Sequence, residues 1–175
     1  VDDLVGIAVT REMGCMMTGI IMCGRTGASF AAQLGTMKVN EEIDAFRALA
    51  ISPTDFLVLP RMVALMLMMP LLVVFANLMG ILGGLLVALA MLDLSLVEYW
   101  NATVHAITLN NYLLGTMKGV CFGVLIAVTG CLRGMQCGTN AAAVGQATTS
   151  AVVLGITSII VADTVFAVLC NLLGI

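Results

Sequence analysis

The sequence has 175 residues, of which 61% are hydrophobic and only 10% are charged, and its formal net charge is −3. A soluble domain carries roughly 25% charged residues because its surface faces water, so this composition argues against a soluble globular protein. The small net charge and the lack of a basic patch with interleaved aromatic residues argue against a nucleic-acid partner.

Four apolar runs are long enough to cross a bilayer, since about 20 mostly apolar residues span its core as a helix. They cover residues 4–35, 62–92, 112–132 and 147–173. The second run has no charged residue, and only Pro70 and three glycines interrupt it. Because lipid offers no partner for an open sheet edge, all four runs are predicted to be helices. The predicted fold is an all-α integral membrane protein, a polytopic bundle with about four transmembrane helices in this chain.

A segment rich in charge, from residue 38 to residue 50, separates the first two runs. Its apolar residues recur at the spacing of one helix face, and they are Val39, Ile43, Phe46 and Ala50. Asn40 is predicted to cap the start of this helix, and Pro53 follows its end. A helix of about ten residues is roughly 15 Å long, which is too short to cross a bilayer. We therefore expect a short helix that lies across one mouth of the bundle.

Lys and Arg in the short loops set the expected orientation, because such loops face the cytoplasm. The loop after the first run contains Lys38, Arg47 and Arg61, and the loop between the last two runs contains Arg133. The loop at residues 93–111 has neither Lys nor Arg. The short charged helix is therefore expected on the cytoplasmic side, either as a solvated connector or as a handle for a cytoplasmic partner.

Four charged residues lie inside the apolar runs, and they are Arg11, Glu12, Lys118 and Asp163. Each would cost roughly 2.5–3.5 kcal/mol at the centre of a membrane helix, so leaving several unpaired would be strongly unfavourable. Counted from the outer ends of their runs, Glu12, Lys118 and Asp163 lie about 12, 9 and 15 Å deep. We therefore predict a mutually neutralising polar cluster in the outer half of the bundle. It would either hold helices together or line a substrate cavity.

Two sets of glycines recur every fourth residue, and they are Gly115, Gly119 and Gly123, then Gly130, Gly134 and Gly138. Small residues at this spacing let two helix backbones approach closely. We expect tight helix packing at these glycines, but the pattern does not name the partner helix.

Catalytic and metal-binding patterns are missing from the sequence. The six cysteines form no CxxC pair, and the only histidine, His105, is distant from the closest cysteine pair, which argues against a metal site. No GxSxG, HExxH or P-loop motif is present, so neither a hydrolase nor a nucleotide-binding loop is indicated. We expect no catalytic residue, metal or cofactor, and any ATP that drives this protein must be bound by another chain.

The run "REMGCMMTGIIMCGRTGASFAAQLGTMKVNEEIDAFRALAISPTDFLVLPR" (residues 11–61) resembles the characteristic motif of the MlaE/YrbE permeases of lipid-transporting ABC systems. The stretches "KGVCFG" (residues 118–123) and "AVGQATTSAVV" (residues 143–153), together with Asp163, also fit the pattern of that family. Two departures are Cys15, where the family usually has proline, and the loop "CLRGMQCGTNAAAVG".

The resemblance implies that residues 1–175 form a single permease domain that lacks an N-terminal interfacial helix and a first transmembrane helix. It implies a homodimeric, multi-pass, non-enzymatic permease of the inner membrane, which moves phospholipid or a related lipid to or from an MCE-domain carrier protein. A separate cytoplasmic ATPase would drive it. The coupling helix for that ATPase would contain Lys38, Glu41, Glu42, Asp44, Phe46 and Arg47. The polar cluster would lie near the lipid path or support it.

The residues alone also allow a proton-coupled secondary transporter, with Glu12, Lys118 and Asp163 as the proton relay. No inverted repeat is evident in the sequence, which counts against this alternative. Such a transporter would work without an ATPase partner.

Overall fold

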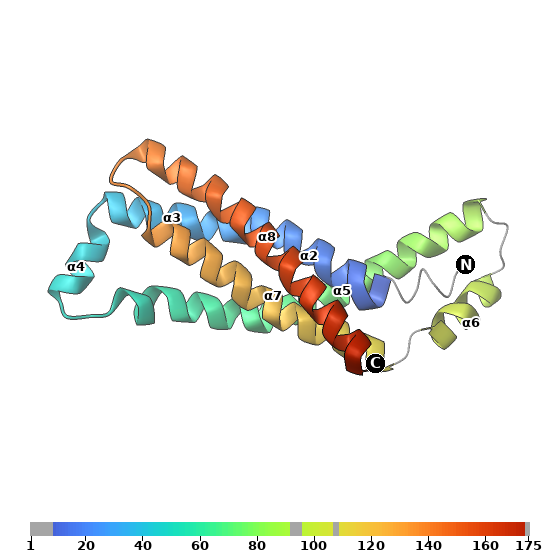
Figure 1. Cartoon of the computed structure of the whole chain (residues 1–175). Coiled ribbons are helices and arrows are strands. Elements are labelled where there is room, and N and C mark those ends of the chain that lie inside the picture. Colours follow the sequence, from blue (N-terminus) through green and yellow to red (C-terminus); the bar gives the residue numbers. More distant parts are fainter. Residues whose placement is uncertain (1–8, 92–95, 107–108, 174–175) are drawn as a thin grey trace.

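The computed structural model describes residues 9–91, 96–106 and 109–173, and every regular element within these ranges is a helix (Figure 1). The predicted all-α class is confirmed. By length and composition, three helical stretches of the described part could cross a membrane: Thr54–Ala90, Asn111–Met135 and Ala141–Leu172. They correspond to the second, third and fourth predicted runs.

The first predicted run is helical from Val9 to Val39, in four consecutive elements. These are η1 (Val9–Met13), α2 (Gly14–Met22), η2 (Cys23–Gly27) and α3 (Ala28–Val39), of which η1 and η2 are π-helical turns. This run is not among the three apolar stretches, and it contains Arg11, Glu12 and Arg25. That it crosses the membrane stays a prediction, and its first residues, 4–8, lie outside the described part.

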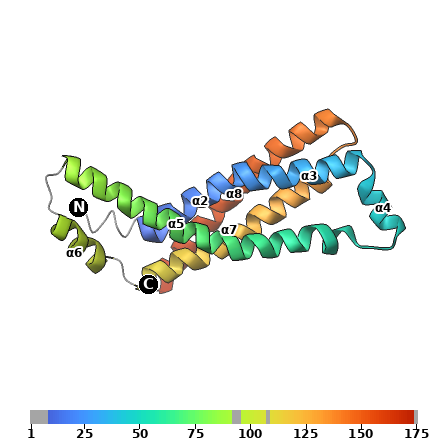
Figure 2. The ribbon, with the colours of Figure 1, turned by 180° about the vertical axis from the view of Figure 1, so that it is seen from behind.

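A second long helix, α5 (Leu59–Met91), follows the π-helical turn η3 (Thr54–Val58). Pro70 lies inside α5, where it cannot donate a backbone hydrogen bond. The helix changes direction along its length in both views, as expected for a helix with an internal proline (Figures 1 and 2). It is followed by α6 (Leu96–Ala106), a helix where the sequence predicted only a loop. The Oη of Tyr99 in α6 donates a hydrogen bond of 2.9 Å to the carbonyl oxygen of Ile81 in α5.

The chain closes with the hairpin of α7 (Leu109–Met135) and α8 (Ala141–Leu173). Asn140 caps α8, because its Oδ1 accepts a hydrogen bond of 2.7 Å from the backbone N–H of Ala143. The α7–α8 loop lies at the same end of the elongated bundle as the short helix α4 (Glu42–Ala48), and α6 lies at the opposite end (Figures 1 and 2). The two loops that carry Lys and Arg therefore share one end, as the predicted orientation requires.

Helix α7 is the centre of the bundle and packs against α2, α3, α5 and α8. Its Phe122, Ile126 and Ala127 are fully buried. They share one apolar core with residues of the surrounding helices, among them Cys15, Cys23, Met69, Val73 and Ile159. Many large apolar side chains on the outer faces of α5 and α8 are exposed, as expected for surfaces that face lipid.

The glycines on α7 mark two close helix contacts, and the structure identifies the partners. A Cβ added at Gly123 would lie 2.9 Å from the carbonyl oxygen of Leu65, so this part of α7 packs on α5. A Cβ at Gly130 would lie 2.8 Å from the carbonyl oxygen of Gly27, and one at Gly134 would lie 2.7 Å from Cβ of Leu34. We call this second contact the α3–α7 seam. The packing role of Gly115 stays a prediction.

Helix α4 is shorter than predicted, and the predicted N-cap at Asn40 is wrong. The N-cap residue is Glu41, which adopts the left-handed conformation with φ of 60° and makes no side-chain capping hydrogen bond. At the other end Ala50 is also left-handed, with φ of 57°. The N–H of Ile51 bonds to the carbonyl of Phe46, which is the Schellman arrangement that ends a helix. Two left-handed residues therefore limit the helix on both sides.

We expect Gly130→Ala to destabilise the protein, because its new Cβ would meet a backbone oxygen that cannot move independently of its helix. Overpacking of this kind typically costs about 1–3 kcal/mol. Gly83→Ala is the matched control: a Cβ there meets nothing within 4 Å, so the alanine should be neutral or stabilising. Thermal unfolding of the purified protein in detergent measures both. An unfolding temperature for Gly130→Ala equal to that of Gly83→Ala would contradict the tight seam.

Candidate functional site

Three of the charges inside the apolar runs meet at one point between η1, α7 and α8. The Nζ of Lys118 donates hydrogen bonds to Glu12 Oε2 at 2.5 Å and to Asp163 Oδ1 at 3.2 Å. The Nε of Arg11 lies 3.7 Å from Glu12 Oε1, which joins the fourth charge to the group. We call these four residues the polar cluster. Residues separated by up to about 150 positions in the sequence thus share one electrostatically neutral site.

The members of the polar cluster differ in exposure, and this sets their chemistry. The side chain of Lys118 is only 2% exposed, whereas those of Asp163 and Glu12 are 18% and 37% exposed. The ammonium group of Lys118 therefore lies inside the bundle, while the carboxylate of Glu12 is partly exposed at the surface of the bundle. Replacing one member of a buried ion pair leaves the others uncompensated, which costs about 3–5 kcal/mol. The cluster can thus hold three elements together and still present a carboxylate to a neighbouring molecule.

The polar cluster borders the apolar core directly. Gly119 follows Lys118, and a Cβ added there would lie 3.0 Å from Cγ2 of Val73 on α5 and 3.9 Å from Sγ of Cys15 on α2. Phe122, one turn along α7 from Lys118, is fully buried. Such surroundings exclude water from one side of the cluster, and ionic interactions are stronger where water is excluded.

The predicted coupling residues divide into two groups in the structure. Exposed on α4 or next to it are the charged residues Glu41, Glu42, Asp44 and Arg47. Phe46 is half-buried, and its ring centroid lies 5.5 Å from that of Phe56. Lys38, by contrast, is not part of α4: it lies in the last turn of α3 and donates a hydrogen bond of 2.8 Å to the carbonyl oxygen of Met135.

Exposed apolar side chains adjoin these charges, which the helical pattern did not indicate. Leu49 and Phe56 are 70% and 60% exposed, and Ile51 is also exposed. Only Ile43 of α4 is buried. The end of the bundle therefore presents a mixed apolar and charged surface, formed by α4 and the chain that follows it, and we call it the α4 surface. Protein interfaces that form and dissociate typically combine such an apolar patch with a polar rim.

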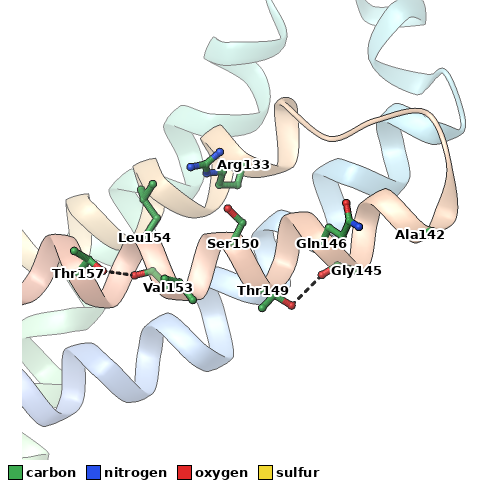
Figure 3. A pocket seen from close by; sticks show the side chains of 9 residues that line it. All are labelled: Arg133, Ala142, Gly145, Gln146, Thr149, Ser150, Val153, Leu154 and Thr157. Atoms are coloured by element: carbon green, nitrogen blue, oxygen red, sulfur yellow. Dashed lines mark hydrogen bonds between the residues drawn. The ribbon is translucent and has the colours of Figure 1, made fainter.

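An open pocket of about 780 Å³ lies between α7 and α8, and the sequence analysis missed it (Figure 3). Figure 3 shows Arg133 reaching over from α7, with Ser150 and Leu154 projecting from α8 on the same side. The hydroxyls of Thr149 and Thr157 bond back to carbonyl oxygens of α8, so the helix satisfies them itself. The one lining residue that stands out in the sequence is Arg133, a loop charge that also indicates orientation.

Lys118→Met is expected to lower stability by about 3–5 kcal/mol, because it leaves the largely buried Asp163 without its cation and leaves Glu12 with Arg11 alone. The triple variant Lys118→Met, Glu12→Gln, Asp163→Asn should recover part of that loss, since it removes the uncompensated charges. Thermal unfolding in detergent compares the two variants with the wild type. A single variant as stable as the wild type would show that the cluster does not hold the helices together.

Comparison with known proteins assigns the chain to a family. A family model described as Permease MlaE matches residues 1–169. A probable ABC transporter permease protein of Rickettsia typhi is 39% identical over 153 residues, which cover 87% of this chain and 59% of the relative. A probable ABC transporter permease protein of Synechocystis is 32% identical over 163 residues, which cover 93% of this chain and 62% of the relative.

A chloroplast relative is the Arabidopsis thaliana protein named TRIGALACTOSYLDIACYLGLYCEROL 1, which is 32% identical over 163 residues. These cover 93% of this chain and 47% of the plant protein. The chain thus spans roughly half to three fifths of the length of these curated relatives. Because the family match includes both the segment around α4 and the helix that carries Asp163, the motif resemblance is confirmed, and the chain belongs to the MlaE permease family.

Proposed function

We propose that the chain is part of the permease subunit of an ABC transporter that moves phospholipid or a related lipid. The lipid would pass between the inner membrane and an MCE-domain carrier protein, and a separate cytoplasmic ATPase would drive its movement. Family membership supports this proposal, and so do the two relatives that are named as probable ABC transporter permeases. The plant relative bears the name of a galactolipid, which favours a lipid substrate.

The observation that carries the proposal is the α4 surface. A connector that only joined two membrane helices would gain nothing from exposed Leu49 and Phe56 beside exposed charges. A docking surface needs both, because apolar contact supplies affinity and charge supplies orientation. Since the relatives are named as probable ABC transporter permeases, we assign this surface to an ATPase subunit.

The polar cluster would support the lipid path. Lys118 joins η1 to α7 and α8 through Glu12 and Asp163, so a change in the spacing of these elements must strain its hydrogen bonds. The partly exposed Glu12 would be the member nearest to a passing lipid headgroup. The cluster would therefore respond to movement of the helices around the path.

A second copy of the chain would complete the permease. The open pocket beside α8 is of a suitable size for lipid between the two copies, since pockets for small ligands typically enclose about 300–1,000 Å³. Exposed valines and threonines continue along the outer face of α8. Small residues such as threonine allow helices to approach closely in a membrane.

The test is copurification of the complete protein that contains this chain with its ATPase subunit, after both are expressed in the same membranes. The double variant Glu42→Lys, Arg47→Glu should lose most of the bound ATPase, because it reverses two exposed charges on α4. Charge reversal at an interface places like charges against each other, which costs several kcal/mol, and each ~1.4 kcal/mol is a tenfold loss of affinity.

The control for this test is Thr139→Lys, which adds a charge in the exposed α7–α8 loop at the same end of the bundle without altering α4. It should retain the ATPase at the wild-type level. If the wild-type permease retains no ATPase at all, the proposed function fails, and proton-coupled transport through the polar cluster becomes the better account.

A further inference from the structure

The contact of Lys38 with α7 separates this residue from the other predicted coupling residues. Lys38 is half-buried at the end of α3, and its Nζ donates to the carbonyl oxygen of Met135, the last residue of α7. The last four carbonyls of a helix have no partner within it, and a lysine side chain can satisfy one of them. A cation at this end also interacts favourably with the helix dipole.

Among the described backbone hydrogen bonds, the α7–α8 loop donates to two other carbonyls at the end of α7 but not to this one. The N–H of Gln136 bonds to the carbonyl of Leu132, and the N–H of Cys137 bonds to that of Gly134. Lys38 therefore completes the end of α7 from outside the hairpin. The Lys38–Met135 hydrogen bond therefore connects the end of α3, which precedes α4, to the end of α7, which precedes α8.

The α3–α7 seam gives this hydrogen bond a rigid setting. A Cβ at Gly134 would lie 3.1 Å from Cα of Ala31, so the two backbones touch less than one turn before Met135. One turn before Lys38, a Cβ at Gly35 would lie 3.4 Å from both Sγ of Cys137 and Cγ1 of Val144. The end of α3 is thus packed against the end of α7, the loop and the start of α8 at once.

The chain that follows α4 also contacts α3. Arg61, near the start of α5, donates through Nη2 to Oε1 of Gln33 at 3.2 Å, and its guanidinium lies 5.3 Å from the ring centroid of Phe30. Gln33 and Phe30 both belong to α3. Helix α3 therefore contacts the chain on both sides of α4: it leads into α4 at Lys38 and binds Arg61 after it.

We infer that Lys38 is a positioning residue, which links the α4 surface to α7 and α8 from inside the permease and does not contact the ATPase. The inference rests on the proposed function and deepens it: a displacement of α4 by the ATPase would reach α7 and α8 through α3, the seam and the Lys38–Met135 hydrogen bond. Helix α7 carries Lys118 and α8 carries Asp163, so the displacement would arrive at the polar cluster. Lys38 would thus affect the coupling of ATP hydrolysis to transport, and would leave ATPase binding unchanged.

The test uses the complete protein assembled with its ATPase in proteoliposomes that contain fluorescently labelled phospholipid. Three quantities are measured: the amount of ATPase bound, the rate of ATP hydrolysis, and the ATP-dependent movement of labelled lipid. Lys38→Met removes the donor, Lys38→Gln keeps polarity on a shorter side chain, and Lys38→Arg keeps a cation that can still reach a carbonyl. Glu42→Lys, Arg47→Glu serves as the comparison that acts on binding.

We expect Lys38→Met and Lys38→Gln to bind as much ATPase as the wild type but to move about tenfold less lipid per ATP hydrolysed, since a hydrogen bond from a charged donor is worth at least that factor. Lys38→Arg should restore coupling. A loss of bound ATPase in Lys38→Gln, wild-type coupling in Lys38→Met, or failure of Lys38→Arg to restore it would each overturn the inference. Failure of the proposed function is separate, because it appears as a wild-type permease that retains no ATPase.

Discussion

The burial of one ammonium group inside an apolar bundle is the constraint on which the rest of the structure depends. Lys118 lies on the central helix α7 and is almost wholly excluded from solvent, so its charge must be balanced from neighbouring elements. Glu12 and Asp163 do this from η1 and α8, and they thereby set the positions of two other elements against α7. In lipid no hydrophobic effect draws helices together, so ionic contacts and close packing must do so.

Close packing at the other end of α7 complements this ionic contact. The seam at Gly130 and Gly134 brings α7 against η2 and α3, and Lys38 closes the end of α7 with a single hydrogen bond. The bundle thus has an ionic connection toward one end and a backbone contact toward the other, both on the same helix. An element held at two distant points moves as a unit, which suits the relay that we propose from the α4 surface to the polar cluster.

The sequence was most informative where a property depends on distance along a helix. The depths of Glu12, Lys118 and Asp163 could be counted, because rise per residue is constant, and the structure brings the three side chains together. The helices that pack against Gly123 and Gly130 could not be predicted, since the glycine spacing indicates a helix face without side chains but not which helix packs on it. The bounds of α4 were also missed, because Glu41 adopts a left-handed conformation that carries no sequence signal in a non-glycine residue. The contact of Lys38 was hidden for a third reason: its partner is a backbone carbonyl 97 positions away.

The measurement that tests the central claim most directly is the energy source of lipid movement. The complete protein, assembled with its ATPase in proteoliposomes, is given labelled phospholipid and either ATP or an imposed proton gradient. The account predicts lipid movement that requires ATP and the ATPase subunit, and that does not respond to the proton gradient alone. Lipid movement driven by the gradient without the ATPase would contradict it, and would turn Glu12, Lys118 and Asp163 from a structural connection into a proton relay.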